Sequence, residues 1–565
     1  MRKRCAQILK MIRLFVLILS IVSVSLGQLL AQGEEGWHLK KADLGSSVGI
    51  SAQNLYSGIL KGQPSHTVVV AVIDSGVDVE HEDLKDNIWI NPGEIADNGI
   101  DDDNNGYVDD IHGWNFIGGA NGNVNDDTYE VTRLYAKYKY KYDGADRAKL
   151  SNDEKAEYDL YVKCKNEVET EMEKSKTGLS RWTQSKESVT AAMDAARMAL
   201  GDTTITMDVL DGISTDGNEA LSMGIRILKD ELANGHAVES VDAVQASANE
   251  QLDGAIKYFD GRIKYAYNPD FDTRDIIGDN YADQYEKHYG NNDVEGPDAF
   301  HGTHVAGIIG AVRNNDTGID GVANNVKIMS VRTVPNGDER DKDVANAIRY
   351  AVDNGASIIN MSFGKGYSWE EKVVEDAINY AKEKDVLLVH AAGNSAQDND
   401  TTDNFPNDHY KGKRFLGIFK AKDKYYENWM EIGALNYKNG EELSAPFSNY
   451  GQKNVDLFAP GMQIYSTIPD DKYENAQGTS MAAPVVAGVA AVLRSYFPTL
   501  TAVQVKNILM SSVTRVNQNV IVPGSNDMKK PFSSLSVSGG VVNVEAAIKL
   551  AKTVKGKKKI VRGRA

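Results

Sequence analysis

The amino-acid sequence predicts an α/β protein with three layers, in which helices cover both faces of a mostly parallel β-sheet. The first observation is a set of continuous apolar runs, typical of strands buried on both faces, at residues 67–73, 326–331, 357–362 and 386–392. The second is that helical patterns separate these runs, as in residues 343–355, whose apolar side chains share one face. Strands that alternate with helices form parallel sheets. The third is a long helical stretch without strand signals, which predicts a helical insertion in this fold.

The N-terminus has the pattern of a secretory signal. Five basic residues precede the apolar run at residues 14–26, and the small residues Gly27 and Ala31 follow it. The alternative is a membrane anchor, but the run is well short of the ~20 residues that span a bilayer. We therefore predict a signal peptide over residues 1–32 and export to the periplasm, the cell surface or the medium. No transmembrane span is expected after its removal.

Composition limits the classes of partner. The 565 residues carry a formal net charge of −18, and 12 of the 62 basic residues lie in the two termini. Residues 33–550 therefore hold 50 basic against 80 acidic groups, which disfavours nucleic-acid binding. Cys5 leaves with the signal, so that only Cys164 remains and no intrachain disulfide is expected. The basic tail is expected to be solvated, with contact to anionic lipid as the alternative. We expect a monomer.

The insertion separates two parts of the α/β domain. Its first helix follows a capping box from Ser151 to Glu154. Three amphipathic faces are carried by Leu160, Tyr161, Cys164, Val168 and Met172; by Leu221, Ile225, Leu228 and Leu232; and by Val241, Val244, Ala248, Leu252, Ile256 and Phe259. The predicted organisation after the signal is residues 33–127 and 266–550 as the α/β domain, 128–265 as the insertion, and 551–565 as the tail.

Three distant segments each place one chemically active side chain at the junction between an apolar run and a turn or helix start. They are AVIDSGVDVEHEDL with Asp74, HGTHVAGIIGAV with His301, and GTSMAAPVVAGVAAVL with Ser480. A serine hydroxyl becomes a nucleophile when a histidine removes its proton, and a carboxylate fixes the tautomer of that histidine. Ser480 opens a predicted helix, whose positive N-terminal end favours a developing oxyanion. A fourth segment, VLLVHAAGN, ends at Asn394 and offers a further amide donor.

The strand pattern supports this grouping. Asp74, Ser362 and Asn394 lie at or just past the carboxyl ends of three predicted strands. In parallel sheets, ligands bind outside the carboxyl ends of the strands. We therefore expect these residues to meet at one edge of the sheet.

Together these segments resemble the subtilisin-like serine peptidases, the subtilase or S8 family, over residues 66–90 and 296–500, with Asp, His and Ser in that family's order. The resemblance implies a secreted serine endopeptidase that cleaves protein or peptide substrates. Asp74, His301 and Ser480 would form the triad, and Asn394 would stabilise the oxyanion.

The same resemblance makes Ser362, Phe363 and Gly364 a substrate-binding strand edge that pairs with an extended peptide. Gly393 is placed with these substrate-binding residues. An extended cleft favours an endopeptidase over an esterase. The preference for the residue at the scissile bond stays open, because no motif identifies the specificity pocket.

A loop rich in acidic residues is a candidate calcium site. In DNGIDDDNNGYVDD, the residues Asp101, Asp103 and Asn105 alternate, and Asp109 follows after a sharp turn. This spacing resembles a D-x-D-x-N-G calcium loop. A full EF-hand is not predicted, because His112 stands where the closing Glu would be. The alternative is a solvated acidic turn.

A second candidate calcium site comes from the resemblance alone. The segment NNDTGIDGVA, at residues 314–323, is similar to the subtilase calcium loop after the histidine helix. That similarity implies Asn315 and Asp83 as ligands. Both predicted calcium ions would be structural.

The sequence also departs from the family pattern. Only about 35 residues separate the predicted signal from the first strand, too few for a folded inhibitory prosegment. One hypothesis is that the insertion assists folding, shields the active site or selects substrates, and the alternative is a decorative surface insertion. Two other functions remain open: a maturation protease of narrow specificity, and a non-catalytic binding protein on the same scaffold.

Overall fold

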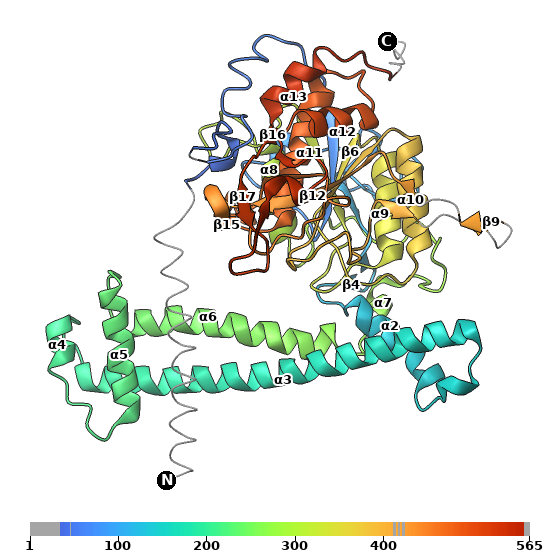
Figure 1. Ribbon diagram of the computed structural model, residues 1–565. Helices are drawn as coiled ribbons and strands as arrows, with labels where there is room; N and C mark the ends of the chain where they lie inside the picture. The colour runs from blue at the N-terminus through green and yellow to red at the C-terminus, as the bar shows by residue number, and fades with distance from the viewer. Residues whose placement is uncertain (1–33, 46, 411–413, 416–418, 421–423, 559–565) are drawn as a thin grey trace. The chain divides into compact units, whose positions relative to one another are not determined.

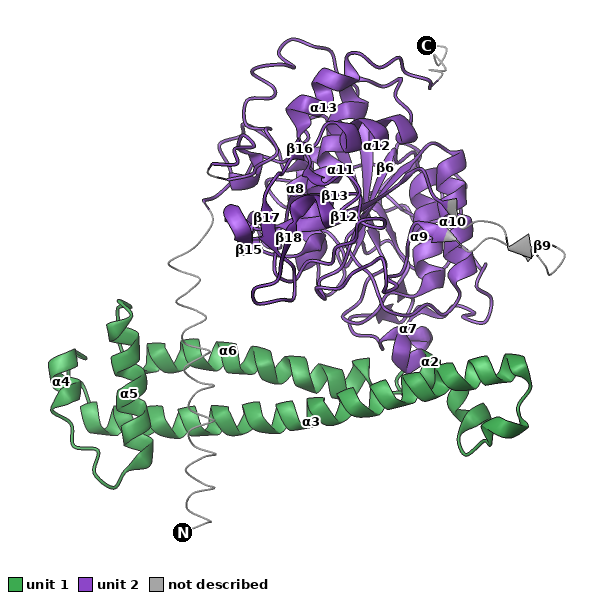
Figure 2. Cartoon of the chain, viewed as in Figure 1, with its two compact units in different colours: residues 1–32, 134–271 green, residues 33–133, 272–565 purple. Residues whose placement is uncertain are grey.

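The computed structural model describes residues 34–45, 47–410, 414–415, 419–420 and 424–558. The predicted signal peptide and the last seven residues of the tail lie outside the described residues. The chain divides into two compact units (Figure 2). The larger unit contains the described parts of residues 33–133 and 272–565, and the smaller unit contains residues 134–271.

One central sheet forms the middle layer of the larger unit. Among the described residues it has nine strands in the order β16-β19-β13-β12-β7-β6-β1-β5-β2. In chain order the strands are β1 (Val68–Asp74), β2 (Gly113–Asn115), β5 (Val326–Arg332), β6 (Ile358–Met361), β7 (Leu387–Ala391), β12 (Trp429–Leu435), β13 (Leu457–Pro460), β16 (Thr514–Arg515) and β19 (Gly540–Val541). Neighbouring strands are parallel, except that β16 and β19 pair antiparallel.

Helices cover both faces of this sheet (Figure 1). Along β1, Val70 and Val72 belong to one hydrophobic cluster, whereas Ala71 and Ile73 belong to another, because side chains alternate along a strand. The first cluster includes α8 (Phe300–Gly310), α11 (Thr479–Tyr496), α12 (Ala502–Ser511) and α13 (Val544–Ala551). The second includes α9 (Asp341–Asp353) and α10 (Glu371–Glu383). The predicted three-layer α/β fold class is confirmed.

The segment before β1 packs into the core. Trp37, Ile50, Leu55 and Leu60 are buried in the same cluster as α8 and α11. The indole nitrogen of Trp37 donates hydrogen bonds to the carbonyls of Met462 and Gln463. These apolar residues are spaced too irregularly to produce a helix or strand signal, so their burial was not predicted.

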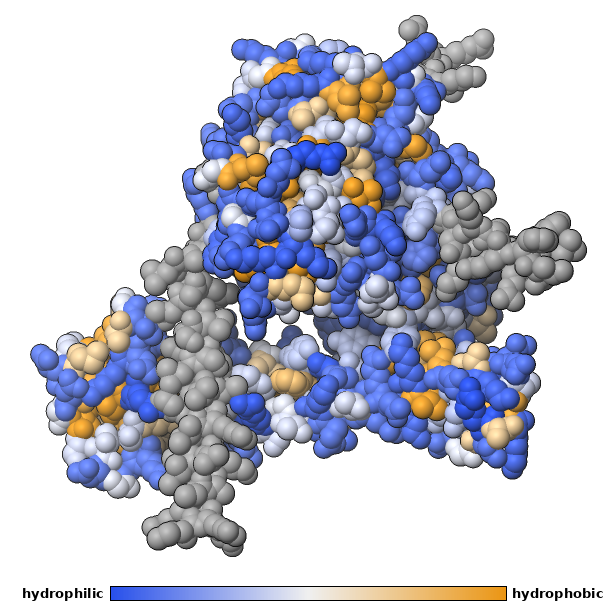
Figure 3. Space-filling model, viewed as in Figure 1, coloured by the Kyte–Doolittle hydropathy of each residue, from blue (hydrophilic) through white to orange (hydrophobic). Residues whose placement is uncertain are grey.

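The remaining elements of the larger unit are short. They are η1 (Trp37–Leu39), η2 (Lys85–Asn87), β3 (Gly118–Gly119), β4 (Gly122–Asn123), α7 (Arg274–Ile277), β8 (His409–Tyr410), β9 (Arg414–Phe415), β10 (Phe419–Lys420), β11 (Lys424–Tyr425), η5 (Gly440–Glu442), β14 (Ile464–Ile468), β15 (Lys472–Ala476), β17 (Asn519–Ile521), β18 (Lys529–Pro531) and η6 (Phe532–Ser534). None of the helices in the described part of the chain combines the length and apolar character needed to cross a membrane. The surface seen in Figure 3 is predominantly hydrophilic.

The smaller unit is helical. It contains most of α2 (Glu130–Tyr142), then η3 (Arg147–Lys149), α3 (Asn152–Leu200), α4 (Met207–Asp211), α5 (Glu219–Ala233), α6 (Val241–Gly261) and a π-helical turn at Arg262–Ala266. The capping box at Ser151 and Glu154 starts α3. The core of the smaller unit is formed by Val189, Met193, Ala196, Leu200, Leu210, Ile225, Leu228, Val241 and Leu252. Helices α3 and α6 approach closely at Gly178, where a Cβ atom would lie 2.5 Å from the ring of Phe259.

The edges of this unit differ slightly from the predicted insertion at residues 128–265. Residues 128–133 pack within the larger unit, where Glu130 and Arg133 are buried. The smaller unit in turn continues to residue 271. The two segments that flank it, 127–133 and 272–274, are called the roots of the insertion below.

Candidate active site

The three predicted catalytic residues occupy the ends of secondary-structure elements. Asp74 is the last residue of β1, His301 is the second residue of α8, and Ser480 is the second residue of α11. The start of α8 lies directly against the turn after β1. A Cβ atom on Gly302 would lie 2.1 Å from the carbonyl oxygen of Gly76, so that only glycine allows this approach.

His301 and Asp74 form a hydrogen bond of 2.6 Å between Nδ1 and Oδ1. The side chain of Asp74 is 2% exposed and that of His301 is 37% exposed. Asp74 Oδ1 also accepts a hydrogen bond from the backbone N–H of Ser75. This geometry places the proton of the neutral imidazole on Nδ1 and leaves Nε2 unprotonated, so that Nε2 can accept a proton.

The charge environment of His301 shifts its pKa. Burial by itself lowers the pKa of His301, but the negative charge of Asp74 and the hydrogen bond to it raise the pKa above its usual value of 6.5. The net direction is upward. An imidazolium formed during the reaction would therefore be stabilised by Asp74.

Ser480 is held by Ser362. Ser480 Oγ donates a hydrogen bond to the backbone carbonyl of Ser362 at 3.1 Å, and Ser362 Oγ donates to the carbonyl of Ser480 at 2.8 Å. Residue 362 follows β6, so this reciprocal pair joins the start of α11 to the end of that strand. The Ser480 hydroxyl is thus directed toward the carbonyl of Ser362.

Asn394 presents its amide nitrogen beside Ser480. Its side-chain oxygen accepts hydrogen bonds from Thr479 N at 2.8 Å and Thr479 Oγ1 at 2.9 Å, which fixes the orientation of the amide. A Cβ atom placed on Gly478 would lie 3.4 Å from both Asn394 Nδ2 and Ser480 N. The two donors therefore face a common space that the missing side chain of Gly478 leaves open.

Thr479 and Asn449 support this donor pair and were not predicted. Thr479 Oγ1 accepts a hydrogen bond from Gly393 N, and Asn449 N donates to the carbonyl of Gly393. The backbone N–H of Ser395 donates to Asn449 Oδ1 at 3.0 Å. Gly393 has a φ of +106°, and a Cβ atom there would lie 2.5 Å from the Asn449 side chain. Asn449 lies 55 residues beyond Asn394 in a segment without a recognisable motif.

The predicted substrate-binding segment follows β6 at one end of the site. Phe363 is buried, whereas Gly364 is exposed, and a Cβ atom on Gly364 would lie 2.8 Å from Asn404 Oδ1. The next residue, Lys365, pairs with Phe405 through two backbone hydrogen bonds. The segment thus ends in a short antiparallel bridge.

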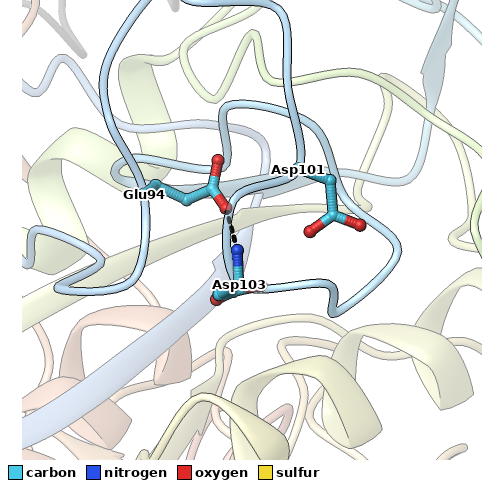
Figure 4. A group of neighbouring side chains, drawn as sticks. All are labelled: Glu94, Asp101 and Asp103. Carbon is cyan, nitrogen blue, oxygen red and sulfur yellow. Dashed lines mark hydrogen bonds between the residues drawn. The ribbon is translucent and has the colours of Figure 1, made fainter.

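The acidic loop brings together three carboxylates. Glu94, Asp101 and Asp103 each offer an oxygen atom, and these atoms lie within 4.8 Å of one another (Figure 4). Glu94 was not predicted, because it lies before the motif. The side chain of Asn105 donates to Asp103 Oδ2. The predicted ligand Asp109 is not part of this group of carboxylates, and its oxygens accept hydrogen bonds from two backbone N–H groups. Three carboxylate oxygens fit a calcium ion, which prefers hard oxygen ligands.

The residues of the second candidate calcium site are also in contact. Asn315 Nδ2 donates to Asp83 Oδ1 at 2.8 Å, and Ile319 N donates to Asp83 Oδ2 at 3.0 Å. Asp83 is fully buried, and burial raises its pKa. The pair joins the loop after β1 to the loop after α8.

Comparisons with known proteins find one family model and several similar proteins. The model of the subtilase family matches residues 65–528. The thermophilic serine proteinase of Bacillus sp. (strain AK1) is 38% identical over 45% of this chain and 54% of its own length. Thermitase of Thermoactinomyces vulgaris is 39% identical over 34% of this chain and 61% of its own length. Subtilisin DY of Bacillus licheniformis is 34% identical over 44% of this chain and 77% of its own length. The chain thus spans between about half and three quarters of these relatives.

Proposed function

Because the chain belongs to the subtilase family, we propose that it is a serine endopeptidase that hydrolyses peptide bonds through an acyl-enzyme. The observation that carries this proposal is the 2.6 Å hydrogen bond between His301 and Asp74, together with two amide donors that face one space beside Ser480. A base with a fixed tautomer and a prepared oxyanion site are the two parts that acyl transfer requires.

In the proposed mechanism, His301 Nε2 takes the proton of Ser480 as Oγ attacks the carbonyl carbon of the substrate. The carbonyl oxygen becomes an oxyanion, which Ser480 N and Asn394 Nδ2 stabilise. The imidazolium then gives its proton to the leaving amine, and the acyl-enzyme remains. A water molecule, deprotonated by His301, releases the acid product and restores Ser480.

The peptide is proposed to bind in an extended conformation along residues 362–364. Main-chain hydrogen bonds to such an edge hold a peptide regardless of most of its side chains. Loss of the Asn394 amide should reduce turnover by about 10²–10³, a magnitude known for this family rather than worked out from the present distances.

Export and calcium are further parts of the proposal. The sequence of residues 1–32 supports a signal peptide. Glu94, Asp101 and Asp103 would hold one calcium ion, and Asp83 and Asn315 would contribute to another. The ions would cross-link loops and neutralise the carboxylates, and the triad carries out the reaction without them.

The experiment is labelling of the purified protein with a fluorophosphonate probe, beside hydrolysis of a chromogenic peptide. The wild type should be labelled at one site and should cleave the peptide. Ser480→Ala should lose both activities, and Asn394→Ala should lose most of the peptide hydrolysis. Labelling that survives in Ser480→Ala, or a folded wild type that neither labels nor cleaves, would contradict the proposal.

A further inference from the structure

The larger unit contains charged side chains at depths where charges are normally absent. Lys365 is 1% exposed, and its partners Glu130 and Asp341 are 0% and 4% exposed. Removing such groups from water is expensive unless each charge is paired with good geometry. Here the pairs are close. Lys365 Nζ lies 2.6 Å from Glu130 Oε2 and 2.7 Å from Asp341 Oδ1, and it also donates to the carbonyl of Glu339.

Lys365 is the residue that directly follows the substrate-binding segment. Its backbone pairs with Phe405, and its side chain points into the buried ionic network. Residues 362–364 are therefore held at one end by the reciprocal contact between Ser362 and Ser480 and at the other by Lys365.

The network continues to the first root of the insertion. Arg133 Nη2 donates to Glu130 Oε2 at 2.9 Å, so that Glu130 Oε2 pairs with two cations, Arg133 and Lys365. Burial by itself would raise the pKa of Glu130, but Arg133 and Lys365 outweigh burial and lower it to about 2. Arg133 also donates to the carbonyls of Asp338 and Glu339, just before α9.

One arginine joins the two roots. Arg340 forms two hydrogen bonds to the carboxylate of Asp127, at 2.8 and 2.9 Å, and Nη2 of the same side chain lies 2.9 Å from Asp272 Oδ1. Asp127 belongs to the root before the insertion and Asp272 to the root after it. The adjacent residue, Asp341, contacts Lys365. The start of α9 thus contacts both roots and the end of the substrate-binding segment.

We propose that Lys365 is a positioning residue for peptide binding, which anchors the substrate-binding segment to the roots of the insertion through Glu130 and Asp341. This inference rests on the proposed peptidase function. Lys365 does not contact the reacting atoms. Its loss should therefore weaken the binding of an extended peptide more than it slows the attack of Ser480.

The test compares Lys365→Met with wild type in two assays. The first measures KM and kcat for a peptide that occupies several subsites, and the second measures the rate of labelling by a small fluorophosphonate. The probe needs only the triad and the oxyanion donors. We expect KM to rise by about tenfold, while kcat and the labelling rate change by less than about threefold.

Lys506→Met is the matched control. Lys506, in α12, donates to the carbonyl of Trp429 and to the carboxylate of Asp456, and so has the same kinds of partner away from residues 362–364. It should leave KM unchanged. Glu130→Gln provides a second variant that retains the shape of the network and should raise KM in the same direction, also where Lys365→Met does not fold.

The outcomes separate the two ideas. Wild-type protein that neither labels nor cleaves would refute the peptidase function, and this inference with it. An active wild type with unchanged KM in Lys365→Met and Glu130→Gln would overturn the positioning role alone. The positioning role would also be overturned if Lys365→Met lowered kcat and the labelling rate by the same factor by which it raised KM. A rise of KM in Lys506→Met equal to that in Lys365→Met would overturn it too.

Discussion

Thr479 is expected to contribute to catalysis through Asn394, and a Thr479→Val substitution tests this. The exchange keeps the shape of the side chain and removes Oγ1, which is one of two donors to Asn394 Oδ1. The remaining donor is Thr479 N at 2.8 Å. A hydrogen bond contributes about 0.5–1.5 kcal/mol, and about 1.4 kcal/mol corresponds to a factor of ten in rate. We therefore expect kcat to fall by about two- to twelvefold.

The upper limit comes from the amide itself. Complete loss of one oxyanion donor costs about 10²–10³ in kcat, and a partial loosening of the Asn394 amide should cost less than its removal. KM should change little, because the oxyanion forms only in the transition state. The assay is steady-state hydrolysis of a peptide substrate, with Thr479→Ser as the control that keeps the hydroxyl.

A double-mutant cycle decides whether the effect passes through Asn394. In an Asn394→Ala background, Thr479→Val should have almost no further effect on kcat, since the group that Thr479 orients is absent. A wild-type kcat in Thr479→Val would refute the reasoning. So would a full additional loss in the double variant, because Thr479 would then act on another group.

Three further predictions concern pH and calcium. The midpoint of the acid limb of the labelling rate should lie above pH 6.5, because the charge of Asp74 raises the pKa of His301 and only the neutral imidazole is a base. Asp74→Asn should move this midpoint to lower pH. A wild-type midpoint at or below pH 6.5 would contradict the assignment. Burial raises the pKa of Glu339 from 4.5 to about 8, so the free energy of unfolding should decrease as the pH rises between these values. In urea unfolding, Glu339→Gln should reduce the difference in this free energy between pH 5 and pH 9. An equal difference in wild type and variant would count against the prediction. Calcium should raise the Tm of wild type more than that of Glu94→Gln or Asp101→Asn in a thermal-shift measurement with magnesium as the control, and equal increases would exclude this site.

The sheet and the positions of Asp74, His301 and Ser480 could be predicted because their signals are local. A strand buried on both faces appears as an unbroken apolar run, and a parallel sheet brings the carboxyl ends of such runs to one edge. The end of β1 at Asp74 and the start of α11 at Thr479 needed no knowledge of distant contacts.

The supporting residues could not be predicted in this way, because their roles depend on contacts between distant segments. Asn449 acts on a loop 55 residues earlier, and Glu94 joins Asp101 and Asp103 from outside their motif. The sequence did not indicate that Lys365 is buried, since a lysine that follows a glycine is typical of a solvated loop. Each of these side chains became interpretable only when its partner was known.

The same contacts explain how the larger unit accommodates a long insertion. A flexible loop of roughly 140 residues would cost about (3/2)RT ln n, or ~4 kcal/mol plus a constant, to close, and the helical insertion replaces such a loop. Asp127 and Asp272 bind the same guanidinium of Arg340, so the ends are already held a few side-chain bonds apart. The larger unit is therefore interrupted at two positions that lie as close together as the ends of a short connection. Because Asp341 and Lys365 belong to the same network, the contacts that hold the ends of the insertion also hold the end of the proposed substrate-binding segment. A displacement at the roots of the insertion should therefore also displace that segment.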